Sequence, residues 1–249
     1  MQIKVYKMKL FRYEITDSTN TRAREYAKSE NPIFPAVFIA DGQTAGRGRR
    51  GRSFDSEKGA GLYISFLFKP HGMARDAVKI TLRAAVALCR VLEKVCGIEP
   101  KIKWVNDILV GGKKLSGILT EGEIDSNGEL EYAVCGIGVN LNSRKFPPEI
   151  SDIVTTVEDI TGKKPDREAL IESLISEFFM EVRDSEIIKE YRRRSAVIGK
   201  PVKVHKLTGE IFSARALDIT DNGELLVEDE NGSRETLISA EVSLRLNQK

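Results

Sequence analysis

Four arginines and four glycines share one short stretch of the chain, where they could bind an anion. They are Arg47, Arg49, Arg50 and Arg52, set among Gly42, Gly46, Gly48 and Gly51. Guanidinium groups donate paired hydrogen bonds to phosphate or carboxylate oxygens, and glycines let the backbone approach a ligand closely. Three interpretations compete: a nucleic-acid-binding tail, a solvated surface turn, and an ordered loop that closes over phosphate. Apolar segments flank the stretch and four like charges repel one another, so the phosphate loop is modestly favoured.

A second group of polar residues lies in the mostly apolar segment 103–119. Asn106 and Asp107 stand among apolar residues, where an unpaired polar group is costly. Asn106 and Asp107 either bond neighbouring parts of the sheet to one another or line a pocket. Lys114 follows a glycine pair, from which its amine could reach such a pocket. Two adjacent lysines after a turn are nevertheless surface residues more often than not.

Other polar residues carry weaker signals. Asn140 ends an apolar segment, where a structural turn is a fair alternative to a binding role. His71 and His205 are far apart in the sequence, so neither is assigned as a ligand. Ser18 has no neighbouring base signature, so we expect it to cap a helix and not to act as a nucleophile.

The composition narrows the class of protein. The chain has 249 residues, of which 41% are hydrophobic and 31% charged, as in a soluble globular protein with a substantial core. A formal net charge of +2 argues against a protein built to hold duplex DNA. Three cysteines without a CxxC pair indicate neither a disulfide framework nor a zinc site. We see no membrane-spanning run and no signal peptide, so a cytoplasmic location is expected.

Apolar periodicity predicts an α+β fold, a mixed β-sheet backed by helices. Strands are expected over 36–43, 61–70 and 130–142, and a hairpin over 101–123 turns at Gly111-Gly112. Helices are expected over 18–30, 76–96 and 166–194, with Gly97 stopping the second. Cys89 and Cys96 lie on the second helix and are expected to be buried.

The pattern changes near residue 197. Short strands with tight turns follow, and Asn222-Gly223 and Asn231-Gly232 are strong hairpin signals. This region predicts a small C-terminal β-barrel. We therefore divide the chain into a domain of residues 1–197 and a domain of residues 198–249.

Taken together, four stretches resemble the biotin–protein ligases in sequence, spacing and order. They are "STN" at 18–20, "GQTAGRGRRGRSF" at 42–54, "KWVNDILVGGKKLSGIL" at 103–119 and "GIGVNLN" at 136–142. The resemblance covers roughly residues 10–195. It implies the class II synthetase-like catalytic fold of that family, and the last fifty or so residues resemble its C-terminal domain, a small SH3-like β-barrel.

The resemblance implies a two-step, ATP-dependent biotin–[acetyl-CoA-carboxylase] ligase reaction. The biotin carboxylate attacks the α-phosphate of ATP and gives biotinyl-5′-AMP and pyrophosphate. A lysine of a biotin carboxyl carrier protein then takes the biotin and releases AMP. Mg²⁺ is expected with the triphosphate, without an assigned protein ligand, and no covalent enzyme intermediate is implied.

The resemblance also implies roles for individual residues. Catalytic roles fall on Arg47, Arg49 and Lys114. The residues implied to bind biotin are Ser18, Thr19, Asn20, Gln43, Arg47, Gly48, Arg49, Lys114, Gly117 and Ile118. Those implied to place ATP are Arg49, Phe54, Asn106, Asp107, Lys114 and Asn140. We also expect the loop 46–54 to be mobile without ligand and to close when biotin or its adenylate binds.

Two features depart from the family pattern. Val105 stands where the family usually has proline, so the local backbone is expected to differ slightly. The first motif begins at Ser18, which leaves no room for the winged helix of the family's DNA-binding members. We therefore expect the ligase-only form, without specific DNA binding or a membrane partner.

Two alternative functions remain open. The nearest is a lipoate–protein ligase, which shares the fold and the adenylation chemistry. A nucleic-acid-binding regulator that uses the arginine loop belongs to another class and fits the near-neutral charge poorly. A homodimer is a further expectation from the resemblance, with no residue here that proves it.

Overall fold

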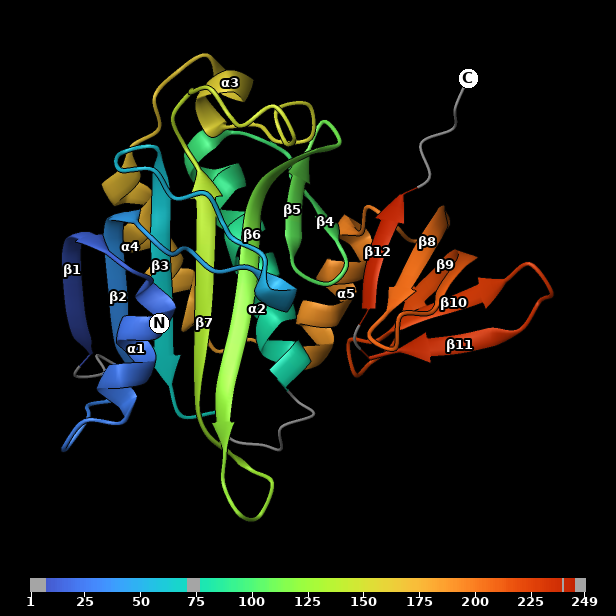
Figure 1. Cartoon of the computed structure of the whole chain (residues 1–249), viewed down its shortest axis with the longest axis horizontal. Helices are drawn as coiled ribbons and strands as arrows, with labels where there is room; N and C mark the ends of the chain where they lie inside the picture. The colour runs from blue at the N-terminus through green and yellow to red at the C-terminus, as the bar shows by residue number, and fades with distance from the viewer. Residues whose placement is uncertain (1–7, 71–76, 239, 245–249) are drawn as a thin grey trace.

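Two β-sheets organise the chain. The computed structural model describes residues 8–70, 77–238 and 240–244. The larger sheet has seven strands in the order β1-β2-β3-β7-β6-β5-β4, and the smaller sheet has five in the order β11-β10-β9-β8-β12. Figure 1 shows the smaller sheet at one end of the molecule, beyond β4 and α5.

The larger sheet is mixed, as the sequence predicts. Its strands are β1 (Lys9–Thr16), β2 (Ala36–Gln43), β3 (Gly61–Phe68), β4 (Lys101–Lys103), β5 (Asp107–Val110), β6 (Lys113–Ile124) and β7 (Leu130–Asn140). Only the β1–β2 pair among these is parallel, and the other neighbours run antiparallel. β1 is an edge strand that the sequence analysis did not assign, because its side chains are mostly exposed and its apolar pattern is weak.

Helices cover both faces of this sheet, and they divide its core in two. Alternate residues of β2 and β3 point to opposite faces, so Val37 and Phe66 join one cluster while Phe38 and Leu67 join the other. The first face carries α2 (Ala77–Val91), α4 (Arg167–Phe178) and α5 (Asp184–Arg194). The second carries α1 (Thr19–Ala27), and the chain between β2 and β3 crosses that face (Figure 1).

The long middle helix ends where its sequence predicts. α2 passes into a π-helical segment, Leu92–Cys96, and Gly97 closes it with a left-handed φ of 67°. Cys89 is buried as expected, but Cys96 is only half-buried, because it lies in the last turn beside that terminus. His71 and Asp76 lie outside the described residues.

Two expected elements are each divided in the structure. The segment 101–110 is not one strand, because β4 and β5 pair with each other across a turn at Trp104–Asn106. The segment 166–194 is two helices, α4 and α5. Arg83 of α2 donates hydrogen bonds to the carbonyls of Met180 (3.3 Å) and Val182 (2.8 Å), which replace the helical bonds that a continuous helix would make there.

The smaller sheet forms the separate C-terminal β domain. Its strands are β8 (Pro201–Lys206), β9 (Ile211–Ile219), β10 (Leu225–Asp229), β11 (Arg234–Leu237) and β12 (Ala240–Leu244). Both predicted asparagine–glycine turns connect neighbouring strands, with φ of 85° at Gly223 and 81° at Gly232. The Trp104 indole donates to the Gly223 carbonyl at 3.0 Å, which fixes this domain to the β4–β5 turn.

A short helix completes the larger domain. α3 (Val157–Thr161) begins after Thr156, whose hydroxyl accepts a hydrogen bond from the Asp159 N–H at 3.0 Å.

None of the helices in the described ranges has the length and apolar character that a bilayer crossing requires.

Candidate active site

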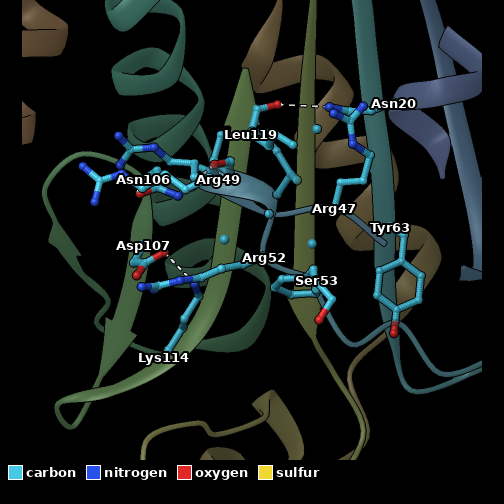
Figure 2. Close-up of a pocket in the computed structure, with 18 of the residues that line it drawn as sticks. Asn20, Arg47, Arg49, Arg52, Ser53, Tyr63, Asn106, Asp107, Lys114 and Leu119 are labelled. Carbon is cyan, nitrogen blue, oxygen red and sulfur yellow. Dashed lines mark hydrogen bonds and ion pairs between the residues drawn. The ribbon is translucent and has the colours of Figure 1, made fainter. Parts of the chain in front are cut away.

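One pocket collects nearly all the residues that the sequence analysis selected. It lies on the face of the larger sheet that carries α1, between the start of that helix, the arginine loop, and strands β5, β6 and β7 (Figure 2). The predicted residues that line it are Ser18, Thr19, Asn20, Gln43, Arg47, Gly48, Arg49, Phe54, Asn106, Asp107, Lys114, Gly117 and Ile118. Residues from far apart in the sequence therefore meet at one place.

Asn140 is the one predicted site residue that does not line this pocket. It is buried at the end of β7, and its amide donates to the Thr155 carbonyl at 3.3 Å. The interpretation of this asparagine as a structural residue, which the sequence left open, agrees with that contact.

The glycine–arginine stretch folds into a hydrogen-bonded loop and not a tail. The Gly48 N–H donates to the Arg52 carbonyl at 2.7 Å, and the Phe54 N–H donates to the Gly46 carbonyl at 2.9 Å. At the tip, Arg50 and Gly51 have φ of 56° and 72°. The positive φ at position 51 explains why the motif has a glycine there, because the left-handed region favours glycine.

The arginines of this loop reach to different walls of the site. Arg47 forms an ion pair with Glu121 of β6 at 2.9 Å. Arg49 donates to the Asn106 side-chain oxygen at 3.1 Å, and Arg50 donates to the His205 carbonyl at 3.0 Å. The loop thus contacts both the larger sheet and the C-terminal domain, which also contributes Val242 to the pocket wall.

Asn106 has both of the roles that its sequence context allowed. Its side-chain N–H donates to the Ile118 carbonyl at 2.9 Å, and the Ile118 N–H donates to its main-chain carbonyl at 3.0 Å. These bonds hold the β4–β5 turn against β6, while the side-chain oxygen faces the loop. The Trp104–Val105 peptide in the same turn is cis.

Lys114 projects into the pocket and Lys113 is exposed. The Lys114 amine lies 2.7 Å from a carboxylate oxygen of Asp107 on the neighbouring strand (Figure 2). A left-handed glycine pair joins the two strands, with φ of 59° at Gly111 and 82° at Gly112. The tight turn therefore places the amine beside the carboxylate.

The start of α1 is held by a polar network that reaches the loop. Gln43 accepts hydrogen bonds from the Thr19 N–H at 2.8 Å and donates to the Ser56 hydroxyl at 2.9 Å. Ser56 in turn donates to the Phe54 carbonyl at 2.8 Å. Ser18 occupies the N-cap position, but its side chain makes no capping hydrogen bond, contrary to its expected role.

A buried serine supports the same helix start. Ser65 lies in the apolar strand β3 and is completely buried. Its hydroxyl lies 2.7 Å from the Thr19 hydroxyl and 2.6 Å from the Asn20 amide oxygen. The sequence analysis missed Ser65; the signal available was a polar residue inside a run of apolar ones.

Two glycines of β7 make room for site residues. A Cβ atom at Gly136 would lie 2.1 Å from the Asn20 side-chain oxygen, and one at Gly138 would lie 2.5 Å from the Phe54 ring. No larger residue fits at either position without moving its neighbour. The "GIG" of the last motif is thus explained by close approach of the α1 and loop side chains to the sheet.

The pocket has an excess of positive charge. Its basic side chains are Arg47, Arg49, Arg50, Arg52, Lys103 and Lys114, whereas Asp107 is the one acidic residue among the described residues that line it. Burial raises the pKa of Tyr63, which also lines the pocket, to about 12, so its phenol stays protonated. Such a site favours anionic ligands. No group of three His, Cys, Asp or Glu side chains that could hold a metal ion occurs in the described part of the chain.

Two family patterns match this chain. Residues 13–140 match the biotin/lipoate A/B protein ligase family, and residues 197–245 match the biotin protein ligase C-terminal domain. The chain is 34% identical to the bifunctional ligase/repressor BirA of Bacillus subtilis, over 98% of this chain and 76% of that protein. The chain belongs to the biotin/lipoate A/B protein ligase family.

Other members of this family are similar over most of their length. The biotin–[acetyl-CoA-carboxylase] ligase of Paracoccus denitrificans is 32% identical, over 91% of this chain and 97% of that protein. The biotin protein ligase of Aquifex aeolicus, solved in complex with biotin and ATP, superposes with a TM-score of 0.80 and 29% identity. That match covers 95% of this chain and 98% of the Aquifex chain.

Eleven of the residues that line the pocket were given no individual role in the sequence analysis. They are Arg50, Arg52, Ser53, Tyr63, Lys103, Trp104, Leu119, Gly136, Ile137, Gly138 and Val242. Arg50, Arg52 and Ser53 belong to the glycine–arginine stretch, and Trp104 lies in the β4–β5 turn. Most of the others lie on strands of the larger sheet, where the apolar pattern did not show which side chains face the pocket. Val242 had no local signal, since it belongs to the other domain.

Proposed function

We propose that this chain is an ATP-dependent biotin–protein ligase. The observation that carries the proposal is the collection of Arg47, Arg49 and Lys114 around one pocket in a chain that superposes on a ligase solved with biotin and ATP. A reaction between a carboxylate and a triphosphate brings like charges together. Guanidinium and ammonium groups placed in advance lower that cost.

In the first step a biotin carboxylate oxygen attacks the α-phosphorus of ATP. A new bond forms between that oxygen and the α-phosphorus. The bond from the α-phosphorus to the oxygen that bridges it to the β-phosphate breaks, and pyrophosphate leaves. We assign neutralisation of the reacting carboxylate and α-phosphate to Arg47, Arg49 and Lys114. Asp107 orients the Lys114 amine through their ion pair of 2.7 Å.

In the second step a lysine amine of a biotin carboxyl carrier protein attacks the mixed anhydride. An amide bond forms, AMP leaves, and the amine loses a proton. The anhydride must be kept from water in the interval, and we assign that task to the loop 46–54. Closure on biotin or its adenylate replaces the repulsion between the loop's arginines with charge-assisted hydrogen bonds.

We divide substrate binding between two sets of residues. Ser18, Thr19, Asn20, Gln43, Gly48, Gly117 and Ile118 contact biotin in this proposal, together with the three catalytic side chains. Phe54, Asn106 and Asp107 help to place ATP. Asn140 acts on ATP indirectly if at all, since its amide is bonded to Thr155.

Magnesium fits this site as a companion of ATP. Mg²⁺ is commonly held by one or two carboxylates together with substrate phosphates, and Asp107 is a carboxylate on the pocket wall. The ion would neutralise charge on the triphosphate. A cytoplasmic location stays a prediction from the sequence, and a homodimer stays a prediction from the family resemblance.

The function is tested by incubating the protein with biotin, Mg-ATP and a carrier domain and then weighing the carrier. The proposal predicts a mass increase of one biotinyl group, on one lysine, that disappears when ATP is omitted. A parallel reaction with lipoate separates the two activities of the family. Modification of the carrier by lipoate, with no reaction of biotin, would reassign the chain to the lipoate branch.

A further inference from the structure

Glu121 of β6 contacts two residues that line the pocket, Asn20 and Arg47, and lies toward the opposite end of the strand from Lys114. Its two carboxylate oxygens contact two different site residues. One oxygen accepts hydrogen bonds from the Asn20 amide at 2.9 Å and from an Arg47 terminal nitrogen at 3.3 Å. The other pairs with the second terminal nitrogen of Arg47 at 2.9 Å and, at the longer distance of 3.7 Å, with Arg24 of α1.

The strand geometry explains why Glu121 can reach these partners. Side chains two residues apart on a strand point to the same face, so Glu121 lies on the face where Gly117 and Leu119 line the pocket. The Leu119 carbonyl accepts a second hydrogen bond from the Asn20 amide at 3.3 Å (Figure 2). Both N–H groups of that amide are therefore occupied, and its orientation is fixed.

Glu121 makes a two-point pair with Arg47. Its side chain is 20% exposed and that of Arg47 is 42% exposed, so the pair is partly shielded from water. A guanidinium has five N–H donors in a fixed plane. The two-point contact with Glu121 uses two of them, sets that plane, and leaves others available for an incoming anion.

We propose that Glu121 is a positioning residue for biotin. One carboxylate fixes the Arg47 guanidinium of the loop and the Asn20 amide of α1 relative to each other, at the part of the pocket assigned to biotin. This inference rests on the proposed function, because it takes biotin as the ligand of Arg47. Glu121 itself does not touch the reacting atoms; it acts through Arg47.

The variant that tests this role is Glu121→Gln. Glutamine keeps an oxygen that can accept from Asn20, but it loses the negative charge that pairs with Arg47. We expect the dissociation constant for biotin, measured by calorimetry without ATP, to rise about tenfold. The matched control is Glu123→Gln, because Glu123 is on the same face of β6 and pairs with Lys28, the residue after α1, at 3.2 Å. It should change biotin affinity less than twofold.

A double-mutant cycle separates positioning from a general structural effect. If Glu121 acts through Arg47, the effect of Glu121→Gln should fall below twofold in an Arg47→Gln background. An equal loss in both backgrounds, or wild-type affinity in the single variant, would overturn the inference. If Glu121→Gln does not fold, Glu121→Asp serves in the same cycle, since it withdraws the carboxylate by one methylene. Failure of the wild-type protein to bind biotin would instead refute the proposed function.

Discussion

The amine of Lys114 and the carboxylate of Asp107 form an ion pair of 2.7 Å across the β5–β6 hairpin. Both side chains line the pocket, and they are about one-third and one-fifth exposed. The pair holds a long flexible side chain at a defined place in a site where other cations repel it. Adjacent lysines after a turn are surface residues more often than not, but this ion pair positions Lys114 in the pocket.

Replacing Lys114 should therefore slow adenylate formation without unfolding the protein. We expect Lys114→Gln to lower the rate of biotin-dependent pyrophosphate release about 100-fold, in the range found when one preorganised electrostatic donor is lost. Lys113→Gln is the matched control, because Lys113 is adjacent and exposed. Equal effects of the two substitutions on the single-turnover rate would remove Lys114 from the mechanism.

Arg49→Ala should release the adenylate. Arg49 donates to Asn106 at 3.1 Å, so the arginine connects the loop to the β4–β5 turn. Without it we expect dissociation of biotinyl-5′-AMP to accelerate about tenfold or more, since a hydrogen bond to a charged group is worth about 1.5–3 kcal/mol. The melting temperature should change little. Dissociation of purified complex and thermal unfolding are measured together; unchanged retention with a large loss of stability would make the arginine structural.

Gly138→Ala should impair the placement of Phe54. The new methyl group would lie 2.5 Å from the ring, which must move. Because Phe54 is assigned to ATP, we expect the KM for ATP to rise about tenfold, the size of effect that about 1.4 kcal/mol of lost binding produces. A second substitution, Phe54→Leu, makes space for the methyl group and should recover part of that loss. A KM for ATP that stays at the wild-type value in Gly138→Ala would contradict this packing argument.

Stability at acidic pH should depend on Arg194, far from the pocket. This guanidinium is 3% exposed and contacts Glu93 at 2.8 Å and Glu190 at 2.7 Å. Removing it leaves Glu93 without its ion-pair partner, while Glu190 keeps a hydrogen bond from Arg90 at 2.9 Å. We therefore expect Arg194→Gln to lower the unfolding free energy by about 3 kcal/mol at pH 7.

The pH dependence of that loss follows from Glu93. The hydrogen bond from Arg194 lowers the pKa of Glu93 below its usual value of 4.5. A carboxyl whose pKa is depressed by folding stabilises the protein above its unfolded pKa, and that stabilisation is lost as the pH falls through the folded pKa. The unfolding free energies of the two proteins, measured by urea titration, should therefore converge as the pH falls below about 4.5. A difference that stays constant from pH 7 to pH 3 would argue against a charge effect.

The sequence predicted which residues meet at the pocket better than it predicted the elements that position them. Residues such as Arg49, Asn106 and Lys114 stand out because charged and polar groups interrupt apolar or glycine-rich patterns. Glu121 does not stand out, since its role depends on a partner about 75 positions away. Ser65 interrupts an apolar run, but that signal does not indicate its partner 45 positions away. Local periodicity cannot reveal such contacts.

Contacts between residues far apart in the sequence also account for the elements that the sequence analysis missed. The expected helix 166–194 breaks because Arg83, almost a hundred residues earlier, bonds the carbonyls at the break. The edge strand β1 forms because β2 offers a parallel partner, with Tyr13 opposite Ala40. Conversely, the Gly111-Gly112 turn and the stop at Gly97 were predictable, because each is decided by the conformation of a single residue.

The most direct test of the account is adenylate formation without a carrier. Purified protein is mixed with Mg-ATP and either biotin, lipoate or neither, and pyrophosphate and the acyl-adenylate are measured in a single turnover. The account predicts one equivalent of pyrophosphate and of biotinyl-5′-AMP per active site with biotin, and background release in the other two mixtures. Release that does not depend on biotin, or that occurs with lipoate alone, would contradict it.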